Sequence, residues 1–394
     1  MKARSSGTRA WAGATAGLLA AGLIWATGTP AVATTTPTGV TTAGLDLADW
    51  MSQLQPAIGA RPLDNIAMPG SHDAGSWSIH DGSGLCTSGQ NYGVSAIAPA
   101  VAASMSRSQS GSIVDQLNAG SRYLDLRLCK QDGAWYTYHG GPTGALFFDA
   151  DGQTGEADAI ARWIDAHPRE IVVIQLSTAA PSAEASADDA EAATDLAGLI
   201  GTGAIATQPQ LSPQSTYDDY LAAGKHVVLI DSAGTVQQPW AWPSSVSSDR
   251  GSYSDASPSW EQYVEEILTG SSPQPLFDTT LSLDQAALAA DPGSDAGKFF
   301  VLQGIIDPSV TIPAAVFAQL EAALGVIPPD IANNYLLWEE DQLNPQLLQR
   351  LTGSWSAPPL SQHMNIVMTD DVDQNTAAMP LGTLQRAVIA VDLD

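Results

Sequence analysis

Short apolar runs recur along the chain, separated by helical patterns and turn-rich segments. Some are almost continuously hydrophobic, such as IVVIQL at residues 171–176 and HVVLI at 226–230, which is typical of parallel strands covered on both faces. The pattern predicts strands at Asn65–Met68, Arg122–Cys129, Trp135–His139, Ile171–Ser177, His226–Ile230, Phe299–Ile306 and Asn365–Thr369.

Helical patterns lie between these runs. Residues Glu156–His167 begin with acidic side chains and stop at Pro168, and Ile113–Asn118 ends before Gly120, as helices commonly do. The alternation of strands and helices predicts an α/β fold, a TIM-type (β/α) barrel that is distorted or incompletely closed and carries loop insertions. We expect this barrel to be a single domain over residues 45–394.

Two stretches show little periodicity. Residues 179–201 are rich in Ala, Ser and Asp, and residues 237–258 are rich in Ser and Trp. We expect loops or insertions there, over the barrel mouth, where barrel enzymes carry their variation.

The first 33 residues have the layout of a secretory signal peptide. Basic residues precede an apolar stretch from Trp11 to Ala26, which is followed by the small-residue site Ala31-Val32-Ala33. We expect cleavage after Ala33 and a secreted protein; an uncleaved membrane anchor is the alternative. Residues 34–44 are Thr-rich and predict a flexible stalk.

Charge excludes one class of partner. The chain has 15 Lys and Arg against 42 Asp and Glu, a net charge of −27, and so lacks the basic surface that binds a nucleic-acid backbone. Hydrophobic residues make up 44% of the 394 residues, enough for a packed core rather than a disordered chain.

Cys86 and Cys129 are the two cysteines of the chain. In an oxidising compartment two thiols of one chain pair more often than they stay free. We therefore expect a disulfide, with two buried free cysteines as the alternative.

Three successive predicted strands carry reactive side chains. His72 and Asp73 follow the first, Asp125 and Arg127 share one face of the second, and His139 ends the third. In a parallel barrel these residues gather at the mouth, where catalytic groups lie.

These residue types suit cleavage of a phosphodiester. One imidazole deprotonates an attacking hydroxyl while the other protonates the leaving oxygen, because imidazole titrates near neutral pH. Arg127 can neutralise charge on the phosphoryl oxygens with its planar fork.

The segments AMPGSHDAGSWSI, QLNAGSRYLDLRL, YTYHG and ARWIDAHPREIVVIQLS follow one another in the chain, and MNIVMTDDV lies near its end. In this order they resemble the X domain of bacterial phosphatidylinositol-specific phospholipases C, members of the phospholipase C-like phosphodiesterase superfamily. The resemblance is dense over residues 60–177 and thin from there to residue 365.

The resemblance implies roles for individual residues. It places the general base at His72, the general acid at His139 and the phosphate-neutralising arginine at Arg127. It assigns Asp73 to support of the general acid, and Asp370, with Asp371 as the competing position, to orientation of the general base. Because metal-dependent relatives carry an acidic residue where Arg127 stands, the resemblance implies an enzyme that needs no metal or other cofactor.

The chain departs from the family pattern around the head group. Relatives that bind inositol use Lys and Arg at the ends of the fourth and fifth strands, where this chain has Ser177 and Asp231 or Ser232. With Asp125, the positions Ser177 and Asp231 are the substrate-binding candidates. The resemblance implies a phosphodiester or phospholipid substrate, a cyclic product and transient contact with a membrane surface, and no stable protein partner is expected. The acidic chain is repelled by anionic bilayers, which disfavours phosphatidylinositol itself.

Two other function classes stay open. The first is a catalytically silent exported binding protein on the same barrel, since a fold does not guarantee activity. The second is a secreted glycosidase that uses the adjacent carboxylates Glu339 and Glu340, although neighbouring residues diverge on a helix or strand.

Overall fold

The structure is a computed structural model. It describes residues 41–149, 155–179, 185–251, 260–290, 293–306 and 313–393. The expected signal peptide and residues 34–40 of the expected stalk lie outside these ranges. The last residues of that segment, Thr42–Gly44, form a 3-10 turn in which Thr42 is buried. In the described part of the chain, no helix combines the length and apolar character needed to cross a membrane.

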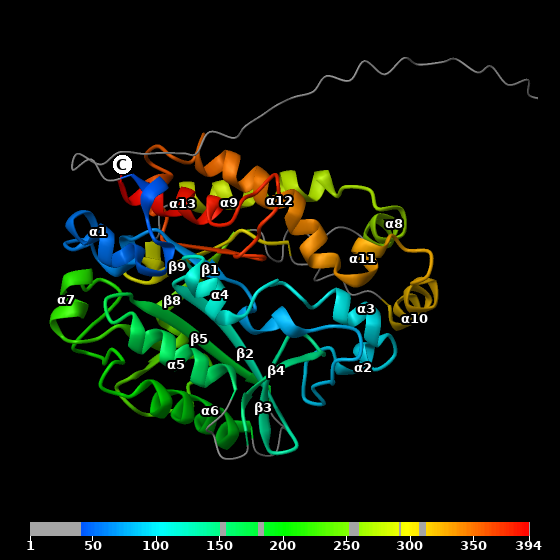
Figure 1. Ribbon diagram of the computed structural model, residues 1–394, viewed down its shortest axis with the longest axis horizontal. Coiled ribbons are helices and arrows are strands. Elements are labelled where there is room, and N and C mark those ends of the chain that lie inside the picture. Colours follow the sequence, from blue (N-terminus) through cyan, green and yellow to red (C-terminus); the bar gives the residue numbers. More distant parts are fainter. Residues whose placement is uncertain are drawn as a thin grey trace, which may run out of the picture. The chain divides into compact units, whose positions relative to one another are not determined.

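A curled sheet of parallel strands forms the centre of the described fold (Figure 1). Its hydrogen-bonded order is β7-β6-β5-β2-β1-β10-β9-β8. The bounds of these strands are β1 Met68–Ser71, β2 Tyr123–Gln131, β5 Val172–Ala179, β6 Val227–Asp231, β7 Ala241–Pro243, β8 Ser247–Arg250, β9 Phe299–Gln303 and β10 Ile366–Thr369.

The two edge strands explain why the barrel is incompletely closed. Only the 3-10 turn Ser244–Val246 links β7 to β8. Parallel neighbours need a crossover of a dozen or more residues, so this link is too short for the two strands to pair. The sheet order contains no β7–β8 pairing among the described strands, and the expected open α/β barrel is confirmed.

A hairpin extends β2 beyond the barrel. Strand β3 (Ala134–Tyr138) runs antiparallel to the last residues of β2, and β4 (Thr143–Phe148) pairs with β3. The expectation that the strand before His139 is a parallel member of the barrel is therefore wrong. Strand β2 is longer than a barrel strand needs, and its surplus length pairs with the returning chain.

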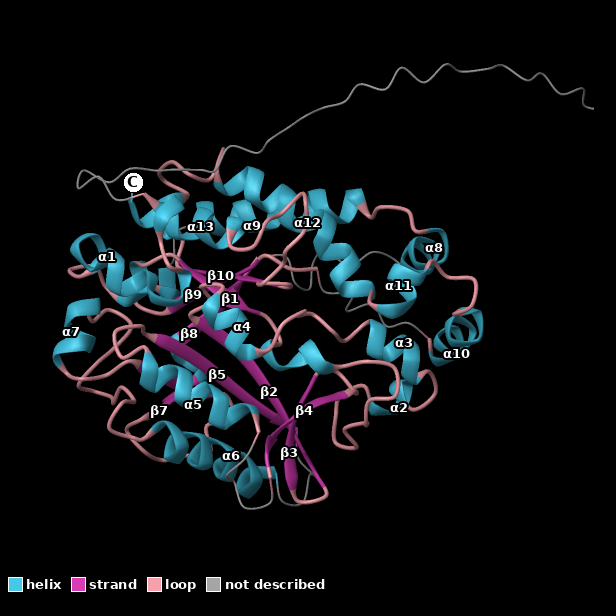
Figure 2. Cartoon of the chain, viewed as in Figure 1, coloured by secondary structure: helices cyan, strands magenta, loops and turns pink. Residues whose placement is uncertain are grey.

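Helices cover the sheet (Figure 2). Apolar side chains of α4, α5 and α6 pack on β2, β5 and β6, whereas those of α9, α12 and α13 pack on β9 and β10. A further cluster joins α3, α8, α10, α11 and the start of α12. The helices are α1 Trp50–Ile58, α2 Tyr92–Ser95, α3 Pro99–Ser104, α4 Ile113–Asn118, α5 Glu156–Ala166, α6 Ala185–Ile200, α7 Tyr217–Ala222, α8 Trp260–Thr269, α9 Gln274–Ala289, α10 Ala314–Ala323, α11 Pro329–Asn333, α12 Tyr335–Leu351 and α13 Thr383–Ala390.

The barrel interior changes character along its axis. Apolar side chains such as Met68, Val173 and Phe299 fill the amino-terminal half. Toward the carboxyl ends of the strands the inward residues become polar, as with Asp125 and Gln303. The apolar half is a packed core that closes one end of the barrel, and the polar half lines the pocket at the other end.

Both segments expected to be loops contain regular structure. Residues 185–200 form helix α6, whose Ala192, Ala193 and Leu196 are buried. The second segment supplies β7 and β8, and Trp242 of β7 is buried and stacks on Phe299. Small alanine side chains give a weak amphipathic signal although they pack closely, which hid the helix in the sequence.

Candidate active site

Three neighbouring strands bring the predicted catalytic residues to one edge of the sheet. Strand β1 pairs with β2 on one side and with β10 on the other. His72 directly follows β1, Arg127 lies on β2, and Asp370 directly follows β10. Because the three strands are parallel, their carboxyl ends meet at the same edge, where barrel enzymes carry their sites.

His139 reaches this edge by way of the hairpin. The register pairs Leu128 with Thr137, so β3 runs back along β2 and ends near the carboxyl end of β1. Gly75 allows the close approach of the turn after His72, since a Cβ at that position would lie 2.4 Å from the side chain of Thr137. The hairpin therefore fixes the position of the second histidine against the first.

Asp370 holds His72 in one orientation. Its Oδ1 lies 2.6 Å from Nδ1 of His72, and both side chains are almost fully buried. The carboxylate accepts the proton of Nδ1, which leaves Nε2 as the atom that faces the site. The competing Asp371 accepts from the hydroxyl of Ser110, so Asp370 and not Asp371 contacts the histidine.

Asp73 is the centre of the charged cluster. Its Oδ2 lies 3.1 Å from Nε2 of His72 and 2.9 Å from Nε2 of His139, and its Oδ1 lies 2.6 Å from Nε of Arg127. The residue adopts the left-handed conformation with φ 41°, which Asp tolerates better than most residues. This backbone turn aims the carboxylate at both histidines and the arginine.

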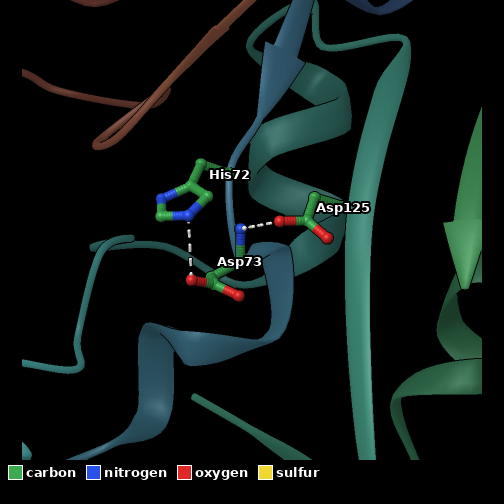
Figure 3. A group of neighbouring side chains, drawn as sticks. All are labelled: His72, Asp73 and Asp125. Carbon is green, nitrogen blue, oxygen red and sulfur yellow. Dashed lines mark hydrogen bonds and ion pairs between the residues drawn. The ribbon is translucent and has the colours of Figure 1, made fainter. Parts of the chain in front are cut away.

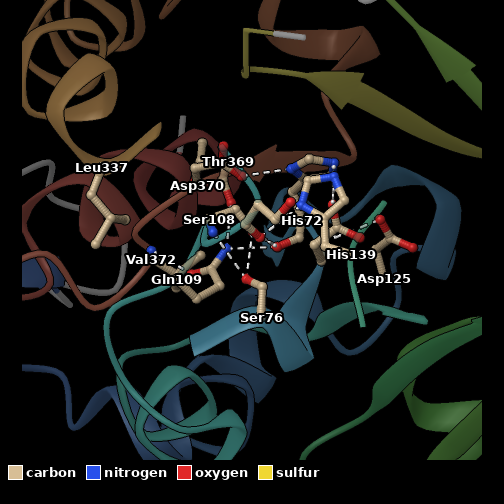
Figure 4. Close-up of polar contacts among 12 residues, drawn as sticks. His72, Ser76, Ser108, Gln109, Asp125, His139, Leu337, Thr369, Asp370 and Val372 are labelled. Carbon is tan, nitrogen blue, oxygen red and sulfur yellow. Dashed lines mark hydrogen bonds and ion pairs between the residues drawn. The ribbon is translucent and has the colours of Figure 1, made fainter. Parts of the chain in front are cut away.

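Backbone contacts also define the protonation of His139. Its Nδ1 lies 2.8 Å from the carbonyl oxygen of Ser106, and a carbonyl only accepts, so Nδ1 carries a proton. Nε2 is the other ring nitrogen, and it faces the carboxylate of Asp73. Figure 4 shows the rings of His72 and His139 near each other. Their centroids are 5.7 Å apart. A single phosphate can therefore contact both rings.

The charges around His72 raise its pKa. Burial disfavours the imidazolium ion, but the carboxylates of Asp73 and Asp370 outweigh this effect and raise the pKa of His72 to about 9. Burial likewise opposes ionisation of Asp73, and Arg127 together with the two histidines holds the pKa of that carboxyl well below its usual range. The cluster thus keeps Asp73 anionic.

Three residues of the cluster have the composition of a metal site. Figure 3 shows the side chains of His72, Asp73 and Asp125 beside one another. One possible ligand atom of each lies within 4.8 Å of those of the other two. Arg127, however, donates to both carboxylates, with Nη2 2.8 Å from Oδ2 of Asp125. A divalent cation would therefore compete with the guanidinium for the same carboxylate oxygens.

A network that the sequence did not reveal supports the histidine. Gln109 Nε2 donates to the carbonyl oxygens of His72 and Thr369, and its Oε1 accepts from the amide of Val372. It is fully buried between the loops that follow β1 and β10. Nothing in the irregular segment SRSQSGS marks this glutamine, because its role depends on two loops far apart in the sequence.

A pocket of about 340 Å³ opens beside Arg127. Its polar lining comes from neighbouring strands, and the second cation, Arg250 on β8, was not predicted. Arg250 pairs with Asp295. The lining residues are Tyr123, Asp125, Arg127, Gln175, Asp249, Arg250, Gly251, Gln303 and Met368.

The structure treats the three substrate-binding candidates differently. Asp125 lines the pocket. Ser177 is the β5 residue paired with Arg127 in the sheet, but it is outside the described lining of the pocket. Asp231 binds its own loop, because its carboxylate accepts from the amides of Ala233, Gly234 and Val236. Substrate binding by Ser177 or Asp231 stays a prediction.

The two carboxylates proposed for a glycosidase are both buried in helix α12. Glu339 and Glu340 are each 1% exposed, and Glu339 accepts from the hydroxyl of Tyr335. They do not face each other across the pocket beside Arg127. The arrangement gives no support to paired-carboxylate glycoside chemistry.

The expected disulfide is present. Cys86 and Cys129 are bonded and fully buried. Cys129 lies two residues beyond Arg127 on β2, and the amide of Cys86 donates to the carbonyl of Gly141, two residues after His139. The disulfide thus joins β2 to the loop that covers the end of the hairpin.

Removal of this disulfide should lower stability. Replacing Cys86 and Cys129 together by Ser opens a loop with a sequence separation of 43 residues, and we expect the free energy of unfolding to fall by about 3–4 kcal/mol through the unfolded chain. Urea unfolding of the variant and of the oxidised parent measures the difference. Equal midpoints and equal slopes would contradict this expectation.

The fold and the cluster define a class of protein: an open parallel β/α barrel with two histidines, an aspartate and an arginine at the carboxyl ends of its strands. No family model matches the chain. PI-PLC X domain-containing protein 1 of Mus musculus is 33% identical over 139 residues, which are 33% of this chain and 39% of that protein. The Danio rerio protein of the same name is 31% identical over 140 residues, 33% of this chain and 43% of that protein.

The resemblance to PI-PLC X domains predicted from the sequence is therefore confirmed. The chain spans about two-fifths of the length of these curated relatives. Among solved structures, the phosphatidylinositol-specific phospholipase C from Listeria monocytogenes is 17% identical, with a TM-score of 0.49 and coverage of 88% of this chain and 99% of that chain.

Proposed function

We propose that the protein is a metal-independent phosphodiesterase of the phosphatidylinositol-specific phospholipase C type. The observation that supports the proposal is that both histidines point their Nε2 atoms at the same place. Nε2 of His72 and Nε2 of His139 lie 3.1 and 2.9 Å from the same oxygen of Asp73, and Arg127 contacts the other oxygen. Base, acid and cation therefore surround one point.

In the proposed first step His72 acts as the general base. Its Nε2 accepts the proton of a substrate hydroxyl next to the phosphate, and that oxygen forms a bond to phosphorus. The bond from phosphorus to the leaving oxygen breaks, and Nε2 of His139 gives its proton to that oxygen. Arg127 stabilises the charge that develops on the non-bridging oxygens. The products are a cyclic phosphodiester and an alcohol.

In a second step the two histidines exchange roles, so that His139 acts as the base and His72 as the acid. Water gives a proton to His139 and attacks the cyclic phosphodiester, and His72 returns its proton to the ring oxygen. A substrate without a neighbouring hydroxyl would need water in the first step. The substrate class is a phosphodiester or phospholipid, and cleavage of a lipid requires transient contact with a membrane surface.

A panel of phosphodiesters tests the proposal. Phosphatidylinositol and other glycerophosphodiesters, with and without a hydroxyl next to the phosphate, are incubated with the protein, and ³¹P NMR identifies cyclic and open products. We expect the compounds that have a hydroxyl next to the phosphate to be cleaved through a cyclic intermediate. Binding of these compounds without turnover of any of them would favour the silent binding protein instead.

The pH dependence of kcat/KM should report the raised pKa of His72. For a substrate whose leaving group needs no proton from His139, such as p-nitrophenolate, only the base must be in the right protonation state. Because the pKa of His72 is raised to about 9, kcat/KM for such a substrate should rise with pH until it levels near pH 9. Replacing Asp370 by Asn removes one of the carboxylates that raise this pKa, so the acidic limb should move to lower pH in that variant. If the acidic limb of the kcat/KM profile stays at the same pH in this variant, the role given to Asp370 is wrong.

We also propose that the protein is exported. The pattern of residues 1–33 supports this, as does the disulfide of Cys86 and Cys129, since disulfides persist mainly in oxidising compartments.

A further inference from the structure

Helix α12 passes behind the carboxylate that holds His72 and carries a buried acid that the proposed mechanism does not use. We propose that this residue, Glu340, is a positioning residue that stays protonated and forms, with Asp370, an acid–carboxylate pair of one negative charge behind His72. The proposal rests on the function proposed above for the importance of His72, although its spectroscopic test does not require turnover.

Contacts of helix α12 place it against Asp370. Asn344, one turn after Glu340, donates from Nδ2 to the carbonyl oxygen of Asp370 at 3.2 Å and lies 3.4 Å from Oε1 of Gln374. Residues four apart share a helix face, so Glu340 is on the face that packs behind the end of β10. On the β9 side, the amide of Ile306 donates to Glu340.

Burial makes it costly for Glu340 and Asp370 to be ionised at the same time. Glu340 and Asp370 are each 1% exposed, and Oε2 of Glu340 and Oδ2 of Asp370 are buried without a hydrogen-bond partner in the described structure. An ionised oxygen in that state has a large desolvation cost. One proton between the two groups removes one of the charges and supplies a donor for the other group.

The surrounding charges indicate which group holds the proton. Burial raises the pKa of Glu340 well above its usual range, and the negative charges of Asp370, Glu339 and Asp371 raise it further. Burial and Asp73 also raise the pKa of Asp370, but the neighbouring His72 and, at longer range, His139 oppose that rise. The proton therefore resides on Glu340, and the negative charge stays on Asp370, against Nδ1 of His72.

The neutral acid has a consequence for catalysis. A donor to the second oxygen of Asp370 limits the basicity of that carboxylate and so limits how strongly His72 holds its proton. Loss of the donor should raise the pKa of His72. Each unit of that rise leaves tenfold less neutral base at a pH below the pKa.

The test compares Glu340→Gln with Glu340→Leu. Gln is neutral and retains a donor, so we expect the wild-type pKa of His72 by NMR titration of the substrate-free protein and kcat/KM within about threefold of wild type. Leu has no donor, so we expect a pKa of His72 raised by about one unit and kcat/KM at neutral pH lowered about tenfold. Glu339→Gln, the neighbouring acid on the same helix, is the control and should leave the pKa of His72 unchanged.

Infrared difference spectra test the proton directly and without substrate. The wild-type protein at neutral pH should show a carboxylic acid C=O band that Glu340→Gln lacks and Glu339→Gln keeps, and this readout holds even if Glu340→Leu fails to fold. Absence of that band, or a pKa of His72 lowered by Glu340→Gln, would mean that Glu340 is ionised and would overturn the proposal. If the band is present and no phosphodiester is cleaved, the acid–carboxylate pair stands and the proposed function fails.

Discussion

His72→Ala and His139→Ala should each lower kcat by about 10²- to 10⁴-fold, the usual contribution of a general acid or base. The expected loss is large because each ring has a separate task, set by its fixed neighbour. Asp370 holds the proton of His72 on Nδ1, and the carbonyl of Ser106 holds a proton of His139 on Nδ1. Steady-state kinetics with a soluble phosphodiester measure the effect.

A matched control separates chemistry from folding. Like His139, His363 is partly buried and its Nδ1 contacts a backbone carbonyl, that of Leu288, but it belongs to the turn before β10. His363→Ala should keep kcat within a few-fold of wild type. Full activity in both His72→Ala and His139→Ala would reject the assignment of base and acid.

Substrates with a good leaving group distinguish the two histidines. A leaving group such as p-nitrophenolate needs no proton, so it should restore much of the rate of His139→Ala and little of that of His72→Ala. Equal restoration in both variants would show that the assignment of acid and base is wrong.

Arg127→Ala should lower kcat/KM by about 10³-fold or more, in the range known for arginines that stabilise phosphoryl-transfer transition states. In the proposed mechanism the guanidinium stabilises charge on the phosphate, and it also forms ion pairs with Asp73 and Asp125. Arg127→Lys keeps the charge but loses the planar fork, so it should recover only part of the loss. The measurement is kcat/KM for the same soluble phosphodiester.

The control for this variant is Arg162→Ala. Arg162 is exposed on α5 and forms an ion pair with Asp158 one turn away, so its removal should leave kcat/KM unchanged. Thermal unfolding of Arg127→Ala checks that the barrel is intact. An Arg127→Ala protein that folds and keeps kcat/KM within threefold of wild type would contradict the role of this arginine.

Strands with strong local patterns were predictable. The run IVVIQL corresponds to β5, and the short helix Ile113–Asn118 has the predicted bounds. Strand β1 was displaced by three residues. Pro69 and Gly70 have low strand propensity, but both pair with β10, and Gly70 pairs with β2 as well. Central position in a sheet outweighed propensity there.

Elements with weak local patterns were not predictable. Helix α6 is rich in alanine, and β7 and β8 are only three and four residues long. Such short strands are stabilised by their neighbours rather than by their own sequence. Arg250 was therefore not recognised as a pocket residue, because its position depends on the pairing of β8 with β9.

The sequence by itself determined the alternating architecture, the residue types of the site and the resemblance to PI-PLC X domains, because buried strands and ordered motifs are local patterns. Only the tertiary structure decided that Asp370 rather than Asp371 contacts His72, that a hairpin delivers His139, and that Gln109 and Glu340 lie behind the site. Those relationships join residues up to 298 positions apart. They depend on the pairing and packing of strands and helices, which no single segment encodes.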